Sequence, residues 1–380
     1  MIYPLRILII LGCLASCSNR QFTIIKNVNV FDGENVLENV DFVFTQNGIE
    51  GIFKESENYI NAIIIDGKGK TILPPLINAH VHVRNAENLK EAQKEGIFGM
   101  LDMFNTDKRA NELRLYNDSL SYAKFYSSNV GATPPGGHGT QYGVNIPTID
   151  DVISSTQFVQ DRIDQNADFI KIINEISMNR LNTLQVKELI DEAHYQSKIT
   201  VAHISDLQSG IEVLNQNVDG LAHIWYRRNS ISNENDLNLI QEKEAFVIPT
   251  LSVILKVIKN ENQSGLNQEF LSAEELKNEV RKLNNKGICL LAGTDSPNFG
   301  MNYSLQFFEE LLLLKECGLS EIEVLKSATT NIYKKFKLEY FNKLELKGKS
   351  NFLLVDGKPY LRIKDIMNKK RVWKNGIEIG

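Results

Sequence analysis

The chain has 380 residues, 42% of them hydrophobic and 23% charged, which is typical of a folded globular protein and excludes a disordered chain. Its length allows one large domain or two domains of ordinary size. The formal net charge of -5 and the pI of about 5.8 offer no basic surface for DNA or RNA, so we expect no nucleic-acid partner.

The first twenty residues differ in composition from the rest of the chain. Arg6 precedes the apolar run ILIILGCLA, which has the layout of a secretory signal and is much shorter than the ~20 residues that span a bilayer. The ending LASC resembles the lipobox of bacterial lipoproteins, in which cleavage precedes a cysteine that then carries lipid. We therefore predict a signal peptide over 1–16, lipidation of Cys17, and an exported lipoprotein anchored to a membrane of the bacterial cell envelope. A simple secretory signal, or an uncleaved anchor with a chance cysteine, is the alternative.

Short β-type segments follow over residues 17–72, where Asp-Gly and Asn-Gly pairs mark the chain reversals. The same pattern returns over residues 344–380, in GKSNFLLVDGKPYLRI and RVWKNGIEIG. Two β-rich pieces on either side of a long middle region predict one small β-sandwich domain formed by both termini.

Residues 73–343 alternate short apolar runs with amphipathic stretches, which predicts an α/β fold with a parallel sheet and crossover helices. Eight such units in about 270 residues match the size of a (β/α)8 TIM-like barrel. A doubly wound open sheet is the alternative, although no Gly-rich phosphate loop follows any of the strands. The expected strands are LINAHVHV, GIFGMLDMF, AKFYSSNVG, DFIKIINE, ITVAHIS, DGLAHIW, AFVIPTLS and ICLLAGTDS.

Histidines gather at the carboxyl ends of the expected strands, the face that houses the chemistry of such barrels. The period of two along a strand places His80 and His82 on one face, where neutral imidazoles can hold a metal ion. Taken alone, this spacing favours a pair of hydrogen-bonded histidines. Three further histidines lie at or just beyond strand ends, whereas His194 lies in a helix and is expected to be structural. The three are His138, His203 and His223.

Two further residues change these odds. Lys171 lies in the strand DFIKIINE, where burial of an ammonium favours loss of the proton, pairing with Glu175, or modification to a carbamate. Asp295 ends the last expected strand, where an N-cap is the alternative role. With His80, His82, His203 and His223 they would bring N and O donors together from five strands. One metal site is more probable than five separate coincidences.

With these residues identified, the chain resembles the amidohydrolase superfamily, closest to its imidazolonepropionase-like and prolidase-like branch. The motifs that carry the resemblance span nearly the whole mature chain. They are LPPLINAHVHV, ADFIKI, VAHIS, VDGLAHI, LAGTDSP, SATTNIYKKF and LELKGKSNFLLVD.

The resemblance implies a centre with two divalent metal ions. His80 and His82 would bind the more buried ion, His203 and His223 the second, and Lys171, as N6-carboxylated lysine, would bridge both. Asp295 would contact the buried ion and carry a proton to the leaving group. Zinc is the expected metal, with manganese, iron or nickel as alternatives.

The implied reaction is hydrolysis of a C–N amide bond by a metal-bridging hydroxide, in a small molecule such as a dipeptide or an N-acyl amino acid. His138, in PPGGHGTQYG, matches a Gly-Gly-His loop whose histidine contacts the substrate or polarises its carbonyl; a structural loop histidine is equally compatible. Tyr226 and Arg227 are candidates to grip a substrate carboxylate, with a solvated rim as the alternative.

The sequence leaves two alternative functions open. A mononuclear deaminase or cyclic-amide hydrolase would leave Lys171 unmodified, and a non-catalytic envelope lipoprotein would bind a ligand without turnover.

The family usually has Gly-Leu-Ile-Asp before the histidine pair, where this chain has Pro75 and Asn78 in PLIN. The segments that follow His203 and His223 also differ from the family pattern. These changes alter the pocket wall, so the substrate and the oligomeric state are left open.

Overall fold

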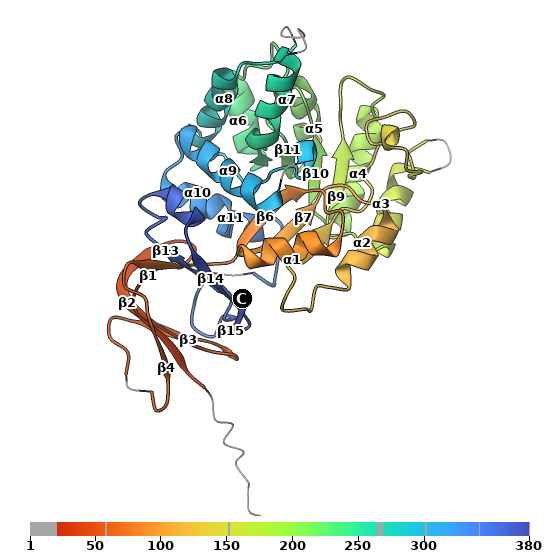
Figure 1. Ribbon diagram of the computed structural model, residues 1–380. Coiled ribbons are helices and arrows are strands. Elements are labelled where there is room, and N and C mark those ends of the chain that lie inside the picture. The colour runs from red at the N-terminus through yellow and green to blue at the C-terminus, as the bar shows by residue number, and fades with distance from the viewer. Residues whose placement is uncertain are drawn as a thin grey trace, which may run out of the picture.

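The computed structural model describes residues 21–57, 59–150, 153–263, 269–300, 302–341 and 343–379. The signal peptide predicted over 1–16 and the lipidation predicted at Cys17 lie outside these residues. Figure 1 shows the strands from both ends of the chain lying together beside a larger, helix-rich region. Among the described residues, none of the helices combines the length and apolar composition needed to cross a bilayer.

Segments from both ends of the chain form one eight-stranded sheet in the order β15-β14-β13-β5-β1-β2-β3, with β4 paired to β1. The junction is the antiparallel pairing of β13 with β5, in which Leu353 faces Leu73. Aromatic rings fill its core, where Phe352 stacks on Trp373 with centroids 5.0 Å apart. The strands are β1 (Thr23–Phe31), β2 (Val36–Thr45), β3 (Gly48–Phe53), β4 (Ile63–Asp66), β5 (Lys70–Leu73), β13 (Phe352–Asp356), β14 (Lys370–Lys374) and β15 (Ile377–Ile379).

The middle of the chain contains two parallel sheets, which confirms the predicted α/β fold. One has the order β6-β7-β8 and the other β12-β11-β10-β9, and every pairing within them is parallel. The strands are buried at every position except Lys124 and Tyr126 of β8 and His203 of β10, as expected when helices cover both faces. They are β6 (Leu76–Val81), β7 (Ile97–Asp102), β8 (Lys124–Ser127), β9 (Ile170–Ile173), β10 (Thr200–His203), β11 (Gly220–Ala222) and β12 (Phe246–Ile248).

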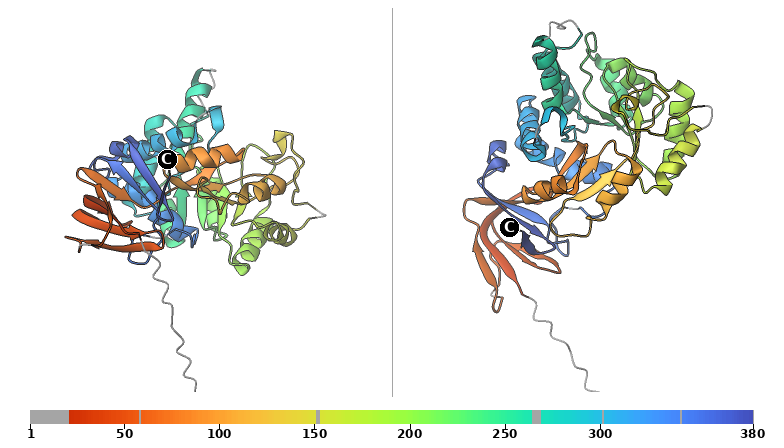
Figure 2. Two further views of the ribbon diagram at one scale, coloured as in Figure 1. Left: turned by 60° about the horizontal axis from the view of Figure 1, so that its bottom comes forward. Right: turned by 45° about the vertical axis from the view of Figure 1, so that its right-hand side comes forward.

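Helices connect these strands and surround them, as Figure 2 shows from two further directions. Side-chain caps define several helix starts: Asn85, Asn182 and Ser272 each accept a backbone N–H in a capping box. The helices are α1 (Ala86–Lys94), α2 (Asp107–Arg114), α3 (Ser155–Asp164), α4 (Thr183–Tyr195), α5 (Leu207–Leu214), α6 (Glu234–Glu242), α7 (Leu251–Gln263), α8 (Ala273–Asn285), α9 (Tyr303–Glu316), α10 (Glu321–Ser327) and α11 (Thr330–Lys335).

Isolated parallel bridges join the two parallel sheets on both sides. On one side Ala132, just after β8, pairs with Ile172 of β9. On the other, the segment 290–296 lies between β12 and β6, because its first residue bridges to Val247 and its last to Val81. Gly293 permits this close approach, since a Cβ at this position would lie 2.9 Å from the backbone nitrogen of His80. The carboxyl ends of these strands therefore meet in one region.

Candidate active site and metal centre

The six residues predicted as metal ligands all line one cavity of about 370 Å³ at the carboxyl ends of the parallel strands. His80 and His82 come from the end of β6, Lys171 from β9, His203 and His223 from the ends of β10 and β11, and Asp295 from segment 290–296. His138, in the loop after β8, lines the same cavity. Residues separated by more than two hundred positions in the chain thus share one small volume.

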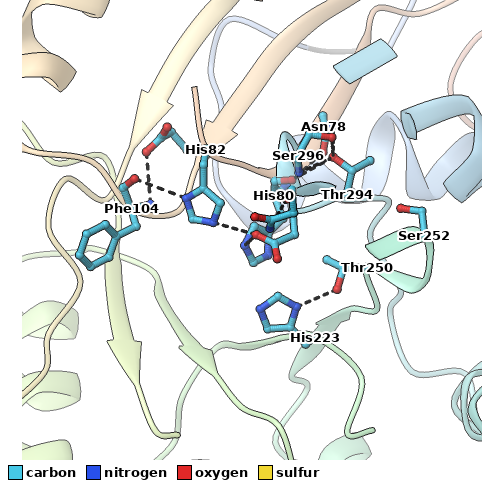
Figure 3. Close-up of polar contacts among 12 residues, drawn as sticks. Asn78, His80, His82, Phe104, His223, Thr250, Ser252, Thr294 and Ser296 are labelled. Carbon is cyan, nitrogen blue, oxygen red and sulfur yellow. Dashed lines mark hydrogen bonds and ion pairs between the residues drawn. The ribbon is translucent and has the colours of Figure 1, made fainter. Parts of the chain in front are cut away.

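The histidine pair of β6 faces the carboxylate of Asp295. The two Nε2 atoms lie 3.3 Å (His80) and 2.8 Å (His82) from its Oδ1 (Figure 3). The other ring nitrogen of His82 lies 3.4 Å from the carbonyl oxygen of Phe104. The Tyr303 hydroxyl donates to the carbonyl of His82 at 2.7 Å. The contacts of both ring nitrogens therefore orient the ring of His82, and the bond from Tyr303 holds its backbone.

The rings of His203 and His223 complete the cluster, with centroids 4.7 Å apart. Nδ1 of His223 lies 2.7 Å from the hydroxyl of Thr250 (Figure 3), which leaves its other ring nitrogen, Nε2, as the candidate metal ligand. Nε2 of His203 lies 3.3 Å from Oε2 of Glu175, which leaves Nδ1. An imidazole held by one nitrogen presents the other in a defined direction, as metal-binding histidines do.

The composition and spacing of the donors fit a divalent metal ion. Ligand atoms of His80, His223 and Asp295 lie within 4.8 Å of one another. Nδ1 of His80 and Nζ of Lys171 are buried without a hydrogen-bond partner among the described residues. Leaving a buried polar atom unpaired costs about 1–3 kcal/mol, so these atoms indicate an absent binding partner. Nitrogen and oxygen donors of this kind suit zinc and similar ions.

The local electrostatics favour the protonation states that bind metals. Burial, assisted by the charge of Lys171, lowers the pKa of His80 to about 3. Burial and the neighbouring histidines likewise hold the pKa of His223 well below its usual value, so both rings are neutral at pH 7. Burial opposes a charge on Asp295, but His80 and His82 outweigh it and keep its pKa well below the usual range. His80 and His223 are therefore neutral imidazoles beside a carboxylate. Burial opposes a charge on His82 as well, but its contact with Asp295 outweighs burial and raises the pKa of this ring.

Lys171 is the least typical member of the cluster. Its side chain is buried and lines the cavity from β9, and burial lowers its pKa to about 7. An appreciable fraction of the amine is therefore neutral, and thus nucleophilic, at physiological pH. The alternative of an ion pair with Glu175 is not formed, because Glu175 contacts His203 and Arg227 instead.

His138 forms part of the wall beside His203. The two rings stack with centroids 4.9 Å apart and an interplanar angle of 14°. Its nitrogens lie 3.2 Å from the side chains of Gln141 and Tyr142, and burial lowers its pKa to about 4. Both ring nitrogens of His138 therefore already have a partner in the loop that carries it. His194, by contrast, contacts Asp219 at 2.8 Å and does not line the cavity.

Tyr226 and Arg227 do not line the described cavity. The Arg227 guanidinium donates to Oε1 of Glu175 at 3.1 Å and to the hydroxyl of Ser205 at 2.9 Å. Tyr226 packs against Phe270, with ring centroids 5.8 Å apart. Arg227 is therefore engaged with Glu175, and through it supports His203.

Several residues that support the site were not singled out from the sequence. Asp102, buried at the end of β7, accepts the backbone N–H of Val83 at 2.6 Å and so anchors the chain directly after His82. Burial raises the pKa of Asp102 to about 6. Its position at the end of an apolar strand is the same signal that pointed to Asp295. Nothing in the local sequence marks Thr250, and Glu175 was expected only as a partner of Lys171.

Asn78, where the family has an aspartate, links β6 to segment 290–296. Its amide donates to the hydroxyl of Thr294 at 3.0 Å, and that hydroxyl lies 2.8 Å from Oγ of Ser296 (Figure 3). The backbone N–H of Asp295 donates to the carbonyl of His80 at 2.8 Å. Asp295 has a φ of +57°, a left-handed conformation that aspartate and asparagine tolerate better than most residues. These bonds hold its carboxylate opposite the histidine pair.

Comparison with known proteins agrees with this geometry. Residues 71–377 match the model of the amidohydrolase family, so the chain belongs to that family and is a hydrolase acting on C–N bonds. A sequence search of curated proteins finds no significant match.

Solved structures share the fold at low sequence identity. A Xaa-Pro dipeptidase with bound methionine is 18% identical, with a TM-score of 0.79 over 94% of this chain and 100% of the other. The ochratoxinase of A. niger is 17% identical, with a TM-score of 0.77 over 94% and 95%. A prolidase complexed with N-methylphosphonate-L-proline is 18% identical, with a TM-score of 0.75 over 94% and 99%.

Proposed function

We propose that this protein is a binuclear metal-dependent hydrolase that cleaves the amide bond of a dipeptide or an N-acyl amino acid. The observation that carries this proposal is the convergence of six nitrogen and oxygen donors, Lys171 among them, on one cavity. The similar structures named as a Xaa-Pro dipeptidase and as a prolidase support a substrate of this kind.

The proposal includes the architecture that holds the site. Strands β6 to β12 and segment 290–296 form a closed (β/α)8 barrel over residues 73–343, supported by the bridges that join the two parallel sheets on both sides. Residues 17–72 and 344–380 form the accompanying β-sandwich domain. The site then lies at the carboxyl-terminal mouth of the barrel, where such folds place their chemistry.

The donors divide into two sets, one for each proposed ion. His80, His82 and Asp295 would hold the first, and His203 and His223 the second. Lys171, as a carbamate, would offer oxygens to both ions. Its Nζ, which has no hydrogen-bond partner among the described residues, would carry the added carboxyl group. When bound, two such ions activate a water molecule at neutral pH and polarise the substrate carbonyl.

Asp295 and His138 are the protein groups that would act on the substrate. Both imidazoles of β6 address Oδ1 of Asp295, which leaves Oδ2 available to take a proton and return it to the departing amine. His138, on the cavity wall, would donate a hydrogen bond from Nε2 to the substrate carbonyl oxygen in place of its contact with the Tyr142 hydroxyl.

Two unpaired arginines favour a substrate with a carboxylate. Arg84, after β6, and Arg109, in α2, both line the cavity, and neither forms an ion pair with a carboxylate of the described residues. Arg227 is already bound to Glu175. Dipeptides and N-acyl amino acids share a terminal carboxylate, which a guanidinium can bind through two parallel hydrogen bonds. We therefore assign the carboxylate end of the substrate to Arg84 and Arg109.

Neutralising these arginines should weaken binding of the carboxylate selectively. Because a hydrogen bond to a charged group contributes about 1.5–3 kcal/mol, Arg84→Gln and Arg109→Gln should each raise KM roughly 10- to 100-fold for a free dipeptide. The same dipeptide with an amidated C-terminus should be little affected. Arg180→Gln is the control, since Arg180 pairs with Glu212 and does not line the cavity. An equal loss with both substrates would contradict the assignment.

Glu175→Gln should weaken binding of the second metal ion. Removing a carboxylate that orients a metal-binding histidine typically costs about 10–100-fold in metal affinity. Calorimetric titration of the metal-free protein with zinc should therefore show one site unchanged and the other weakened. Glu212→Gln is the matched control, because Glu212 pairs with Arg180 outside the cavity. Unchanged affinity at both sites would show that Glu175 serves only to hold Arg227.

Metal quantification together with an activity screen tests the main proposal. Protein produced with bicarbonate should contain two divalent ions per chain and hydrolyse members of a dipeptide library. One ion per chain with deaminase or cyclic-amide hydrolase activity would favour the mononuclear alternative. Ligand binding without turnover of any substrate would favour a binding lipoprotein.

We also propose that the protein is exported and held at a membrane of the cell envelope by lipid on Cys17, on the strength of the lipobox-like sequence LASC. Mass spectrometry of the N-terminal peptide should show the lipid. Cys17→Ser should release the protein from the membrane fraction.

A further inference from the structure

An uncovered apolar edge lies where the described chain begins. Among the described residues, strand β4 pairs with β1 alone, so none of them covers its other edge as a strand. Its first two residues, Ile63 and Ile64, point to opposite faces of the strand, and they are 52% and 56% exposed. Ile60, in the preceding turn, is 89% exposed. Figure 1 shows β4 at the end of the terminal sheet remote from the helices. We call Ile60, Ile63 and Ile64 the isoleucine edge.

The first described residues, Gln21 and Phe22, are held beside this edge. The side chain of Gln21 donates to the carbonyl of Asn61 at 2.8 Å, and the N–H of Ile63 donates to the carbonyl of Phe22 at 2.9 Å. The ring of Phe22 packs on that of Tyr59, with centroids 4.6 Å apart. The position of Gln21 relative to the isoleucine edge is therefore fixed.

Chain length then limits how far the edge can lie from a membrane anchor. Three residues lie between Cys17 and Gln21, which makes four steps along the chain, and even a fully extended chain spans at most about 3.6 Å per step, or about 14 Å. An uncleaved apolar anchor ending near residue 15 would impose a similar limit. Either form of attachment holds the isoleucine edge within reach of the bilayer surface.

We propose that the isoleucine edge inserts into the interfacial layer of the membrane and fixes the orientation of the protein on it. This inference rests on the membrane attachment proposed above. The charged residues nearby are mixed, with Lys54 and Lys68 beside Glu55, Glu57 and Asp66. The contact is therefore hydrophobic rather than electrostatic, so it needs no anionic lipid and resists salt. The cavity lies at the carboxyl end of β6, whereas the amino end of β6 follows β5, a strand of the same sheet as β4.

Tryptophan at the edge tests this contact in the full chain reconstituted into phosphatidylcholine vesicles. Ile60→Trp should lose roughly half or more of its fluorescence to brominated lipids, because interfacial segments bury apolar side chains by about 5–10 Å. Ile63→Trp should behave similarly, and 0.5 M salt should change neither result, since it screens charges beyond about 4 Å. Tyr195→Trp, at the end of α4, is the control, because Tyr195 is 82% exposed. The native Trp225 and Trp373 are buried and contribute a constant background.

The outcomes separate this inference from the attachment on which it rests. Lipid on Cys17 without quenching at either edge position would overturn the inference alone. Protein that neither carries lipid nor associates with vesicles would overturn the attachment and the inference together. Protection of Ile60→Trp in a detergent-solubilised dimer, without quenching in vesicles, would assign the edge to a second copy of the chain and overturn the membrane contact.

Discussion

Asp295→Asn should lower kcat/KM by roughly 100- to 10,000-fold, the range expected for removal of a general acid–base group. The amide cannot take the proton that Oδ2 is proposed to carry, and it lacks the charge that faces His80 and His82. Asparagine fits the left-handed φ of +57° at this position, so the backbone should be unchanged. Steady-state kinetics with the best dipeptide substrate provides the measurement.

A variant at a second aspartate, outside the site, is the control for this result. Asp191→Asn removes a carboxylate that pairs with Lys187 on the surface of α4, and it should leave kcat/KM unchanged. Circular dichroism should show the same fold for both variants. If Asp295→Asn retained more than a tenth of the activity, a different group would have to carry the proton.

Lys171→Met should stabilise the metal-free protein, and it should abolish the activity of the metal-loaded enzyme. Burial lowers the pKa of Lys171 to about 7, from an ordinary value of 10.5. Between these two pH values the unfolded chain binds a proton that the folded chain does not, so the free energy of unfolding of the wild type rises with pH across this window. At pH 7 the variant should be more stable by roughly 4–5 kcal/mol, since the two pKa values differ by about 3.5 and each pKa unit corresponds to about 1.36 kcal/mol. Its advantage should shrink toward pH 10.5.

Urea unfolding at several pH values, with chelator and without carbon dioxide, measures this difference. Lys198→Met is the matched control. The Lys198 ammonium donates to a backbone carbonyl at 2.8 Å, so the variant that lacks it should be less stable than the wild type. A Lys171→Met variant no more stable than the wild type at pH 7 would show that the ammonium is accommodated in the folded protein.

The same position tests the carbamate when metal and bicarbonate are present. Lys171→Ala should bind fewer metal ions per chain than the wild type, because the proposed bridging oxygens are missing. A small carboxylate such as acetate should partly restore the second ion, since it offers a similar pair of oxygens in the space vacated by the side chain. Restoration by chloride at the same concentration would instead indicate a general effect of anions.

Much of the candidate site follows from the sequence because of how parallel strands are arranged. Side chains at the carboxyl ends of such strands meet on one edge of the fold, whatever the helices between them do. His80, Lys171, His203 and Asp295 could therefore be grouped from strand-end positions alone. The α/β fold followed from the alternation of apolar runs and amphipathic stretches, and the shared sheet of the two ends agrees with the β-rich pattern at both.

The contacts that orient these residues could not be predicted in the same way. Glu175 holds His203 and Arg227, and Thr250 holds His223, through loops that carry no periodic pattern. Arg227 was a candidate for the substrate carboxylate, but its distance to Glu175 became known only from the loop conformations. The sequence by itself determined which donor atoms reach the cavity, because strand periodicity places them. The tertiary structure alone decided which of them are already paired, because pairing depends on distances between loops far apart in the chain.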